Sequence, residues 1–318
     1  MTTVERNPGI LLDLGWAART NFVNRSAVER RASTLTKRRS IKKDWQAAWL
    51  LKAVTMIDLT TLAGDDTPGN VRRLCAKARQ PIRQELLTEM GMPSDLSVAA
   101  VCVYHALIPA ALEALKGTSI PIAAVSTGFP AGQSPFEQRV EEIESSVAAG
   151  AKEIDIVISR ARVLRGEWEG LYDEVKEFRH ACGEAHLKTI LATGELGNLR
   201  NVRMASLVCM MAGADFIKTS TGKEKVNATL SFGLVMARAI RDYHERTGYR
   251  VGLKPAGGIR SAKDALNWLI LIKDELGDAW LTSELFRLGA SGLLDDIERQ
   301  LSHHVTGRYA ARHHIPMG

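Results

Sequence analysis

The sequence has few cysteines and no long hydrophobic run. Its four cysteines, Cys75, Cys102, Cys182 and Cys209, show no CxxC or CxxxC spacing, which argues against a zinc site and a disulfide framework. No apolar run reaches the roughly 18 residues that a membrane span needs, and the first residues lack the basic and then apolar pattern of a secretory signal. We therefore expect no membrane association and a location in the reducing cytoplasm.

The sequence also lacks the usual motifs of cofactor sites. No dinucleotide glycine fingerprint follows the first predicted strand. The letters STGK end at Lys223, but Glu224 stands where a nucleotide-binding P-loop requires Ser or Thr. The histidines at 303–304 and 313–314 are adjacent pairs in polar surroundings, without the spacing of metal ligands. We expect neither a cofactor nor a metal.

Length and composition limit the fold. The chain has 318 residues, of which 45% are hydrophobic and 25% are charged, as in a globular protein with a large core. This length suits one α/β barrel of roughly 250 residues with an extension, or two ordinary domains. The net charge of +6 fits an anionic substrate or, less specifically, a nucleic acid.

Part of the positive charge is local. Residues Arg30–Lys43 are rich in lysine and arginine and contain no acidic residue. The run has no interleaved aromatic residues and no known binding motif, so a solvated helix face explains it better than a nucleic-acid arm. We do not expect a nucleic acid to be a partner, although a basic RNA-binding protein is the alternative from a different functional class.

Eight short apolar runs alternate with amphipathic stretches. The predicted strands are Ala53–Leu59, Val98–Tyr104, Ile122–Thr127, Glu153–Ile158, Leu187–Ala192, Phe216–Thr219, Val251–Pro255 and Leu285–Gly289. Helix starts lie between them. Thr67 precedes a proline, a capping box is predicted at Ser134–Glu137, and Ser261 with Asp264 three residues later predicts the start of another helix. Eight strand–helix units predict the α/β class and a (β/α)8 TIM barrel. Residues 1–46 are predicted as an N-terminal helical extension packed on the barrel, and residues 47–318 as the barrel domain.

Two lysines stand at the polar ends of predicted strands: Lys218 in GADFIKTSTGK and Lys254 in VGLKPAGGIR. Active-site residues of such barrels lie at the carboxyl ends of the strands. If the strands are neighbours, the two ammonium groups repel each other, so that one can lose its proton and act as a nucleophile. The alternative for each lysine alone is a side chain that reaches from the strand end into solvent.

Asp155 interrupts the apolar strand EIDIVIS. A buried carboxylate is costly unless a cation pairs with it. Facing two or three lysines at one barrel mouth, Asp155 is expected to hold a charge network and transfer protons. A purely structural ion pair is the alternative.

Glycine-rich loops follow the last two strands. Gly257 and Gly258 precede one predicted helix, and Ser291 lies just before the last. Backbone N–H groups and helix N-termini at these positions bind phosphate in many barrels. Each loop alone could be only a tight turn.

The motifs DFIKTSTGK, GLKPAGGIR, EIDIVI, MIDLTTL, AVCVY and FRLGAS, in this order and spacing, resemble the deoxyribose-phosphate aldolases. These are class I aldolases that interconvert 2-deoxyribose 5-phosphate with acetaldehyde and glyceraldehyde 3-phosphate. The resemblance covers roughly Trp45 to the C-terminus, and the long extension and tail are similar to the animal-type branch. It implies a small phosphorylated sugar as substrate.

The resemblance also implies roles for individual residues. Lys218 would be the Schiff-base lysine, Lys254 the neighbour that lowers its pKa, and Asp155 the acid/base. The implied substrate-binding residues are Asp58, Cys102, Thr221, Gly222, Lys223, Gly257, Gly258 and Ser291.

The match has gaps. Gly292 stands where members often have a second hydroxyl, and Tyr309 is only a candidate for the family's C-terminal tyrosine. The closest alternative is another barrel aldolase or transaldolase that acts on a different phosphorylated sugar. The sequence is compatible with a homo-oligomer but does not fix the oligomeric state.

Overall fold

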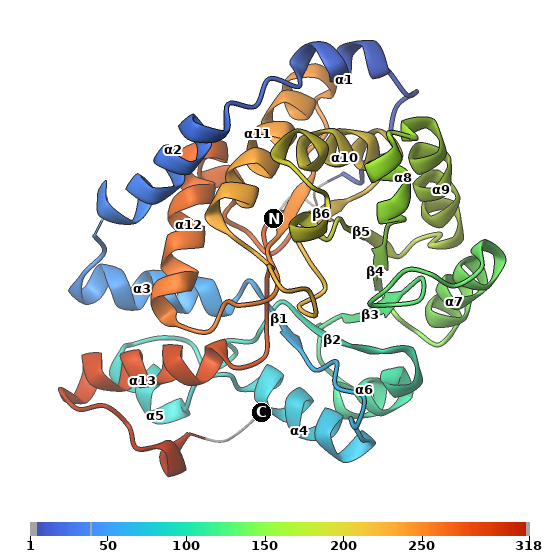
Figure 1. The fold of residues 1–318 in the computed structure, drawn as a ribbon. Helices are drawn as coiled ribbons and strands as arrows, with labels where there is room; N and C mark the ends of the chain where they lie inside the picture. The colour runs from blue at the N-terminus through green and yellow to red at the C-terminus, as the bar shows by residue number, and fades with distance from the viewer. Residues whose placement is uncertain (1–4, 39, 316–318) are drawn as a thin grey trace.

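The computed structural model describes residues 5–38 and 40–315 and contains a sheet of eight parallel strands at its centre (Figure 1). The strands are β1 (Ile57–Thr60), β2 (Ala100–Tyr104), β3 (Ile122–Ser126), β4 (Glu153–Val157), β5 (His186–Ile190), β6 (Phe216–Lys218), β7 (Gly252–Lys254) and β8 (Leu288–Ala290). Each predicted strand overlaps one of them. Their carboxyl ends therefore meet on one face of the molecule.

The sheet closes on itself. Neighbouring strands follow the order β7-β6-β5-β4-β3-β2-β1-β8, and parallel bridges Leu253↔Phe286 and Ala256↔Gly289 join the two remaining edges. The predicted (β/α)8 barrel is confirmed.

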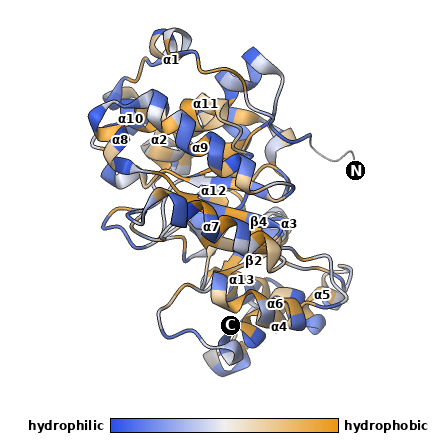
Figure 2. Cartoon of the chain, turned by 90° about the vertical axis from the view of Figure 1, so that its right-hand side faces the viewer, coloured by the Kyte–Doolittle hydropathy of each residue, from blue (hydrophilic) through white to orange (hydrophobic). Residues whose placement is uncertain are grey.

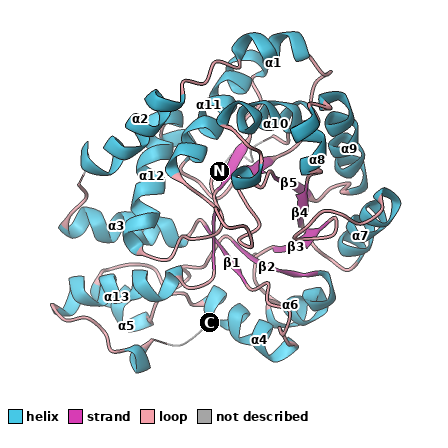
Figure 3. Ribbon diagram, viewed as in Figure 1, coloured by secondary structure: helices cyan, strands magenta, loops and turns pink. Residues whose placement is uncertain are grey.

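Helices surround the strands on the outside (Figure 3). They are α1 (Leu14–Thr20), α2 (Arg25–Arg38), α3 (Lys43–Val54), α4 (Pro68–Arg79), α5 (Gln84–Glu89), α6 (Ile108–Ala114), α7 (Phe136–Ala148), α8 (Arg160–Arg165), α9 (Trp168–Ala181), α10 (Leu199–Met211), α11 (Leu230–Thr247), α12 (Ala262–Leu276) and α13 (Leu293–Thr306). Short 3-10 turns add η1 (His105–Leu107), η2 (Thr193–Glu195), η3 (Asp278–Trp280) and η4 (Arg312–His314). Figure 2 shows largely hydrophobic strands between helices that mix hydrophilic and hydrophobic residues.

The first predicted strand began too early. Ala53 and Val54 are the end of α3, and β1 starts only at Ile57. Both residues are fully buried, as are the apolar residues of the strand. A buried helix end and a buried strand look alike in a short apolar run, so hydrophobicity could not separate them.

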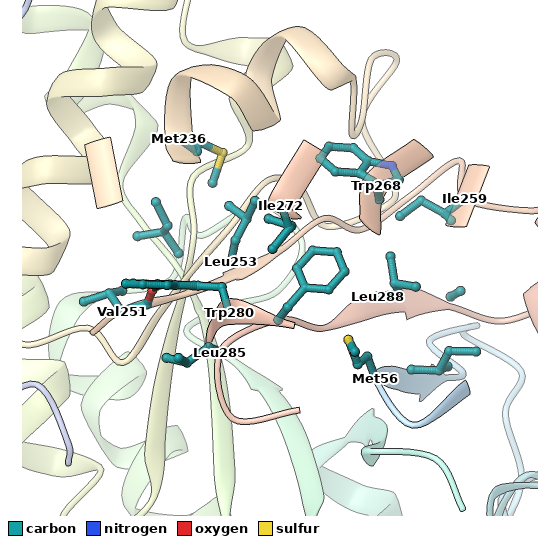
Figure 4. Packing of buried hydrophobic residues seen from close by; sticks show 14 of the residues in the cluster. Met56, Met236, Val251, Leu253, Ile259, Trp268, Ile272, Trp280, Leu285 and Leu288 are labelled. Carbon is teal, nitrogen blue, oxygen red and sulfur yellow. Dashed lines mark hydrogen bonds between the residues drawn. The ribbon is translucent and has the colours of Figure 1, made fainter. Parts of the chain in front are cut away.

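The core between the last strands and their helices is densely filled (Figure 4). Leu253 from β7 and Leu288 from β8 belong to the same buried hydrophobic cluster as Trp268 and Ile272 of α12. The indole N–H of buried Trp280 donates to the carbonyl of Val251 at 2.9 Å, so its polar atom is satisfied. This packing fixes the two strand ends that carry the glycine-rich loops.

Residues 5–13, which precede α1, are attached to the barrel through Asn7, which is almost fully buried. Its amide donates to the carbonyls of Met210 and Ala214 at 2.7 and 2.9 Å, and its carbonyl accepts from the Tyr243 hydroxyl at 2.9 Å. Met210 belongs to α10, Ala214 lies between α10 and β6, and Tyr243 belongs to α11. The N-terminal segment is thus part of the folded core.

Helix α2 continues this attachment by packing on α11 and α12. Arg31 pairs with Glu275 at 3.3 Å. Helix α3 runs through position 46, so a continuous helix crosses the predicted boundary between extension and barrel domain, and that division stays a prediction. No helix among the described residues is long and apolar enough to cross a membrane.

Candidate active site

The two lysines singled out in the sequence are direct neighbours. Lys218 ends β6, Lys254 ends β7, and the register pairs one with the other. Both ammonium groups donate to the same oxygen, Oδ2 of Asp155 on β4, at 2.8 and 2.7 Å. All three side chains are buried. The structure thus brings together the three predicted catalytic residues.

Asp155 is a carboxylate held in its charged form. Burial alone would raise its pKa, but three ammonium groups outweigh burial and hold the pKa well below its usual range. The third is Lys188 of β5, which donates to Oδ1 at 3.1 Å. A buried carboxylate with three cationic partners can tolerate one of them losing its charge.

Lys218 is the amine most easily deprotonated. Burial is the main cause that lowers its pKa; the Asp155 carboxylate opposes this, and the charge of Lys254 reinforces it. For Lys254, burial acts in the same direction, but the carboxylates of Asp155 and Asp58 raise the pKa above its usual value. Two adjacent lysines therefore have pKa values shifted in opposite directions, as expected for one nucleophile and one permanent cation.

The charge network extends deeper into the barrel. Lys188 pairs with Glu153, and Arg287 donates to Asp58 and Glu153 at 2.5 and 2.8 Å. The network contains three carboxylates and four basic groups: Asp58, Glu153, Asp155, Lys188, Lys218, Lys254 and Arg287. Neutral Lys218 makes the buried charges balance, which gives a second physical reason for its lowered pKa.

A cavity of about 310 Å³ opens above these lysines. Its lining includes Lys218 and Lys254 together with six of the predicted substrate-binding residues: Thr221, Gly222, Lys223, Gly257, Gly258 and Ser291. Two predicted features, the amine and the glycine-rich loops, therefore share one cavity.

The loop after β7 presents free donors to this cavity. Gly257 and Gly258 have φ angles of +81° and +84°, a region in which other residues are strained. A Cβ on Gly257 would lie 2.7 Å from the side chain of Asn227, so there is no room for one. In the part of the chain that the structure describes, no hydrogen bond occupies the backbone N–H of either glycine. Such groups suit an anion.

The comparisons with known proteins agree with this geometry. Residues 52–290 match the model of the DeoC/LacD family of aldolases. The chain belongs to the DeoC/LacD aldolase family. It is 64% identical to the deoxyribose-phosphate aldolase of Mus musculus over 97% of this chain and 98% of that protein, and 62% identical to that of Homo sapiens over 98% of both.

The solved structure of a deoxyribose phosphate aldolase from Aeropyrum pernix has the same fold as this family member. It aligns with a TM-score of 0.59 and 22% identity, covering 81% of this chain and 97% of that chain.

Two of the predicted substrate-binding residues, Asp58 and Cys102, do not line the cavity. Asp58 has no exposed surface and pairs with Lys254 and Arg287. Cys102 is fully buried in a small apolar cluster with Leu62, and burial raises the pKa of its thiol. Contact of either residue with substrate stays a prediction.

Tyr309 follows α13 and is about half exposed. Its ring stacks on His303, with the ring centres 4.4 Å apart. Its role in proton transfer also stays a prediction. Among the described residues, no group of three His, Cys, Asp or Glu side chains could hold a metal ion.

Three residues of the site, Glu153, Arg287 and Arg260, were not predicted from the sequence. Glu153 precedes Asp155 by two positions on β4 and so faces the same side of the strand, a signal that strand periodicity offers. Arg287 comes just before β8, and its charge within an apolar run was a second signal. Arg260 lines the cavity and adds a cation close to the glycine-rich loop.

Proposed function

We propose that the protein reversibly cleaves 2-deoxy-D-ribose 5-phosphate to acetaldehyde and D-glyceraldehyde 3-phosphate, through a Schiff base on Lys218. The observation that carries the proposal is a buried lysine of lowered pKa in a cavity that also presents free backbone donors. The names of the mouse and human relatives support this substrate and this reaction.

Imine formation uses the neutral amine. Lys218 Nζ attacks C1 of the open-chain aldehyde, and the resulting carbinolamine loses water to give an iminium ion. The iminium brings a positive charge close to Asp155, whose carboxylate is 2.8 Å from the Lys218 nitrogen in the free protein. A preorganised carboxylate at this position stabilises the charge that develops.

Cleavage then draws electrons into the iminium. A proton leaves the C3 hydroxyl, the C2–C3 bond breaks, and D-glyceraldehyde 3-phosphate departs, leaving an enamine on Lys218. Asp155, supported by Lys254, is positioned to accept that proton through a bound water and later to return one to C2. Protonation regenerates an iminium, and water hydrolyses it to acetaldehyde and the free amine.

Phosphate binding is assigned to the rim of the cavity. The free N–H groups of Gly257 and Gly258, the N-terminus of α13 beside Ser291, and the cations of Lys223 and Arg260 all favour an anion there. The phosphate would lie at one end of the cavity and C1 near Lys218.

The decisive experiment is reductive trapping. Borohydride added with 2-deoxyribose 5-phosphate reduces the iminium and should add the mass of the reduced sugar, or of the ethyl group left after cleavage, to the peptide that contains Lys218. An assay of acetaldehyde release on the same preparation separates this reaction from that of another barrel aldolase or a transaldolase. Label on Lys254 or Lys188, with Lys218 unmodified, would contradict the assignment.

We also infer that the protein acts in the cytoplasm. All four cysteines are free and buried, which suits a reducing compartment. A homo-oligomer stays a prediction, which a molar-mass measurement in solution would test.

A further inference from the structure

The turn after β6 contains three consecutive N–H groups that already have acceptors. Thr221 N donates to both carboxylate oxygens of Glu224 at 3.0 and 3.1 Å, and Gly222 N donates to Oε2 at 3.2 Å. Lys223 N donates to the Thr221 hydroxyl at 3.0 Å. We call residues 219–223 the TSTGK turn.

Thr221 and Gly222 line the cavity above Lys218 together with Gly257 and Gly258, so a phosphate bound there would lie beside these N–H groups. A carboxylate and a phosphate both present negatively charged oxygens, so they compete for the same donors. Across residues 5–38 and 40–315, no basic side chain forms an ion pair with Glu224. The turn is therefore the main partner of this carboxylate.

The turn does not need the carboxylate for its shape. The Asn227 amide donates to the backbone carbonyl of Glu224 at 2.8 Å, and the Thr221 hydroxyl holds Lys223 N. Gly222 has a φ of +90°, which glycine adopts without strain. Contacts that do not involve the Glu224 carboxylate thus already brace the C-terminal half of the turn and the residue that follows it.

We propose that Glu224 is an internal competitor of the substrate phosphate. In the free protein its carboxylate occupies the TSTGK turn, and the phosphate gains those donors only after displacing it. The phosphate meets the free N–H groups of Gly257 and Gly258 first and exchanges with the carboxylate afterwards. Glu224 therefore weakens the binding of phosphorylated ligands and leaves unphosphorylated sugars unaffected. This inference rests on the phosphate site of the proposed function.

The test compares Glu224→Gln with a matched control. Glutamine keeps the size and an acceptor oxygen but removes the charge. Glu177→Gln makes the same change on the exposed face of α9, away from the cavity. Isothermal titration calorimetry of the full chain with inorganic phosphate reads binding directly. Steady-state kinetics then give KM for the phosphorylated sugar and kcat/KM for unphosphorylated deoxyribose.

If the carboxylate occupies the turn about 90% of the time, its removal strengthens phosphate binding by up to about 10-fold, because apparent affinity scales with the fraction of open sites. In Glu224→Gln we expect the Kd for inorganic phosphate and the KM for the phosphorylated sugar each to be about 3- to 10-fold lower. Neither value should change in Glu177→Gln, and the kcat/KM for unphosphorylated deoxyribose should stay the same in both variants.

Unchanged or weaker phosphate binding in Glu224→Gln, or no binding of phosphate to either variant, would overturn the inference. Calorimetry needs no turnover. Tighter binding in a protein that releases no acetaldehyde would therefore refute the proposed reaction and leave the role of Glu224 standing.

Discussion

The pKa of Lys218, the proposed Schiff-base lysine, depends on the groups around its side chain. Lys218 has one carboxylate and one ammonium group in direct reach, and both come from other strands. The sequence indicated this pair and Asp155 because charged residues at the ends of apolar runs are conspicuous. It did not indicate that burial is the main cause of the lowered pKa of Lys218, because this burial arises only when the barrel closes.

Replacing Lys254 should change the pH dependence of the reaction. Without its charge, one cause of the lowered pKa of Lys218 is gone, so that pKa rises in Lys254→Leu. Since the nucleophile must be neutral, the acidic limb of the kcat/KM profile should move to higher pH. The measurement is a pH–rate profile, with circular dichroism to confirm the fold. An unshifted limb would mean that the two amines are not coupled.

Replacing Asp155 should cost both rate and stability. Turnover of Asp155→Asn should fall by roughly 10²–10⁴, the usual contribution of a positioned acid/base. The structure predicts a loss of stability of about 3–5 kcal/mol, because three buried ammonium groups lose a charged partner. Steady-state kinetics and urea unfolding measure the two effects, and near-normal turnover would refute the acid/base role.

At the level of helices and strands, the sequence predicts a helix start correctly where the capping residues bond to each other within the same turn. Helix α12 starts after Ser261 as predicted, and Ser261 and Asp264 form a capping box whose two hydrogen bonds lie within one turn. The box predicted at Ser134–Glu137 is wrong: Pro135 is the cap of α7 and makes no side-chain hydrogen bond. Pro135 was expected to be the first residue of the helix, but α7 starts at Phe136. The cap position is therefore one residue later than Ser134, so Ser134 and Glu137 do not have capping-box spacing.

The N-terminus of α13 gives a test of the phosphate site. In Ser291→Asp, a carboxylate beside this helix end would compete with and repel the phosphate. A loss of about 1–3 kcal/mol in binding would raise KM for the phosphorylated sugar roughly 5- to 150-fold. The kcat/KM for unphosphorylated deoxyribose should change far less. Equal losses for both substrates would place the phosphate elsewhere.

Across the whole molecule, the buried charge network couples stability to acid. Burial alone would raise the pKa of Asp58, Glu153 and Asp155, but their cationic neighbours lower it. The unfolded chain, with pKa values of about 3.9 for Asp and 4.3 for Glu, then binds more protons than the folded one at low pH. Their contribution to stability is therefore complete above these values and is lost as the pH falls toward the folded pKa.

Urea unfolding at several pH values measures this loss. Between pH 5 and pH 3 the free energy of unfolding should decrease with a slope that approaches about 1.4 kcal/mol per pH unit for each of these carboxylates. A value that stays constant over this range would mean that the carboxylates titrate alike in both states.

The attachment of Asn7 has a consequence for biosynthesis. Its hydrogen-bonding partners in the barrel lie 203 to 236 positions later in the chain. During translation the segment around Asn7 leaves the ribosome long before Tyr243 does, because 236 positions separate the two residues. Until then the segment has no place to dock, and β1 waits even longer for its neighbour β8. The nascent chain must therefore remain protected from aggregation and proteases until β8 has emerged.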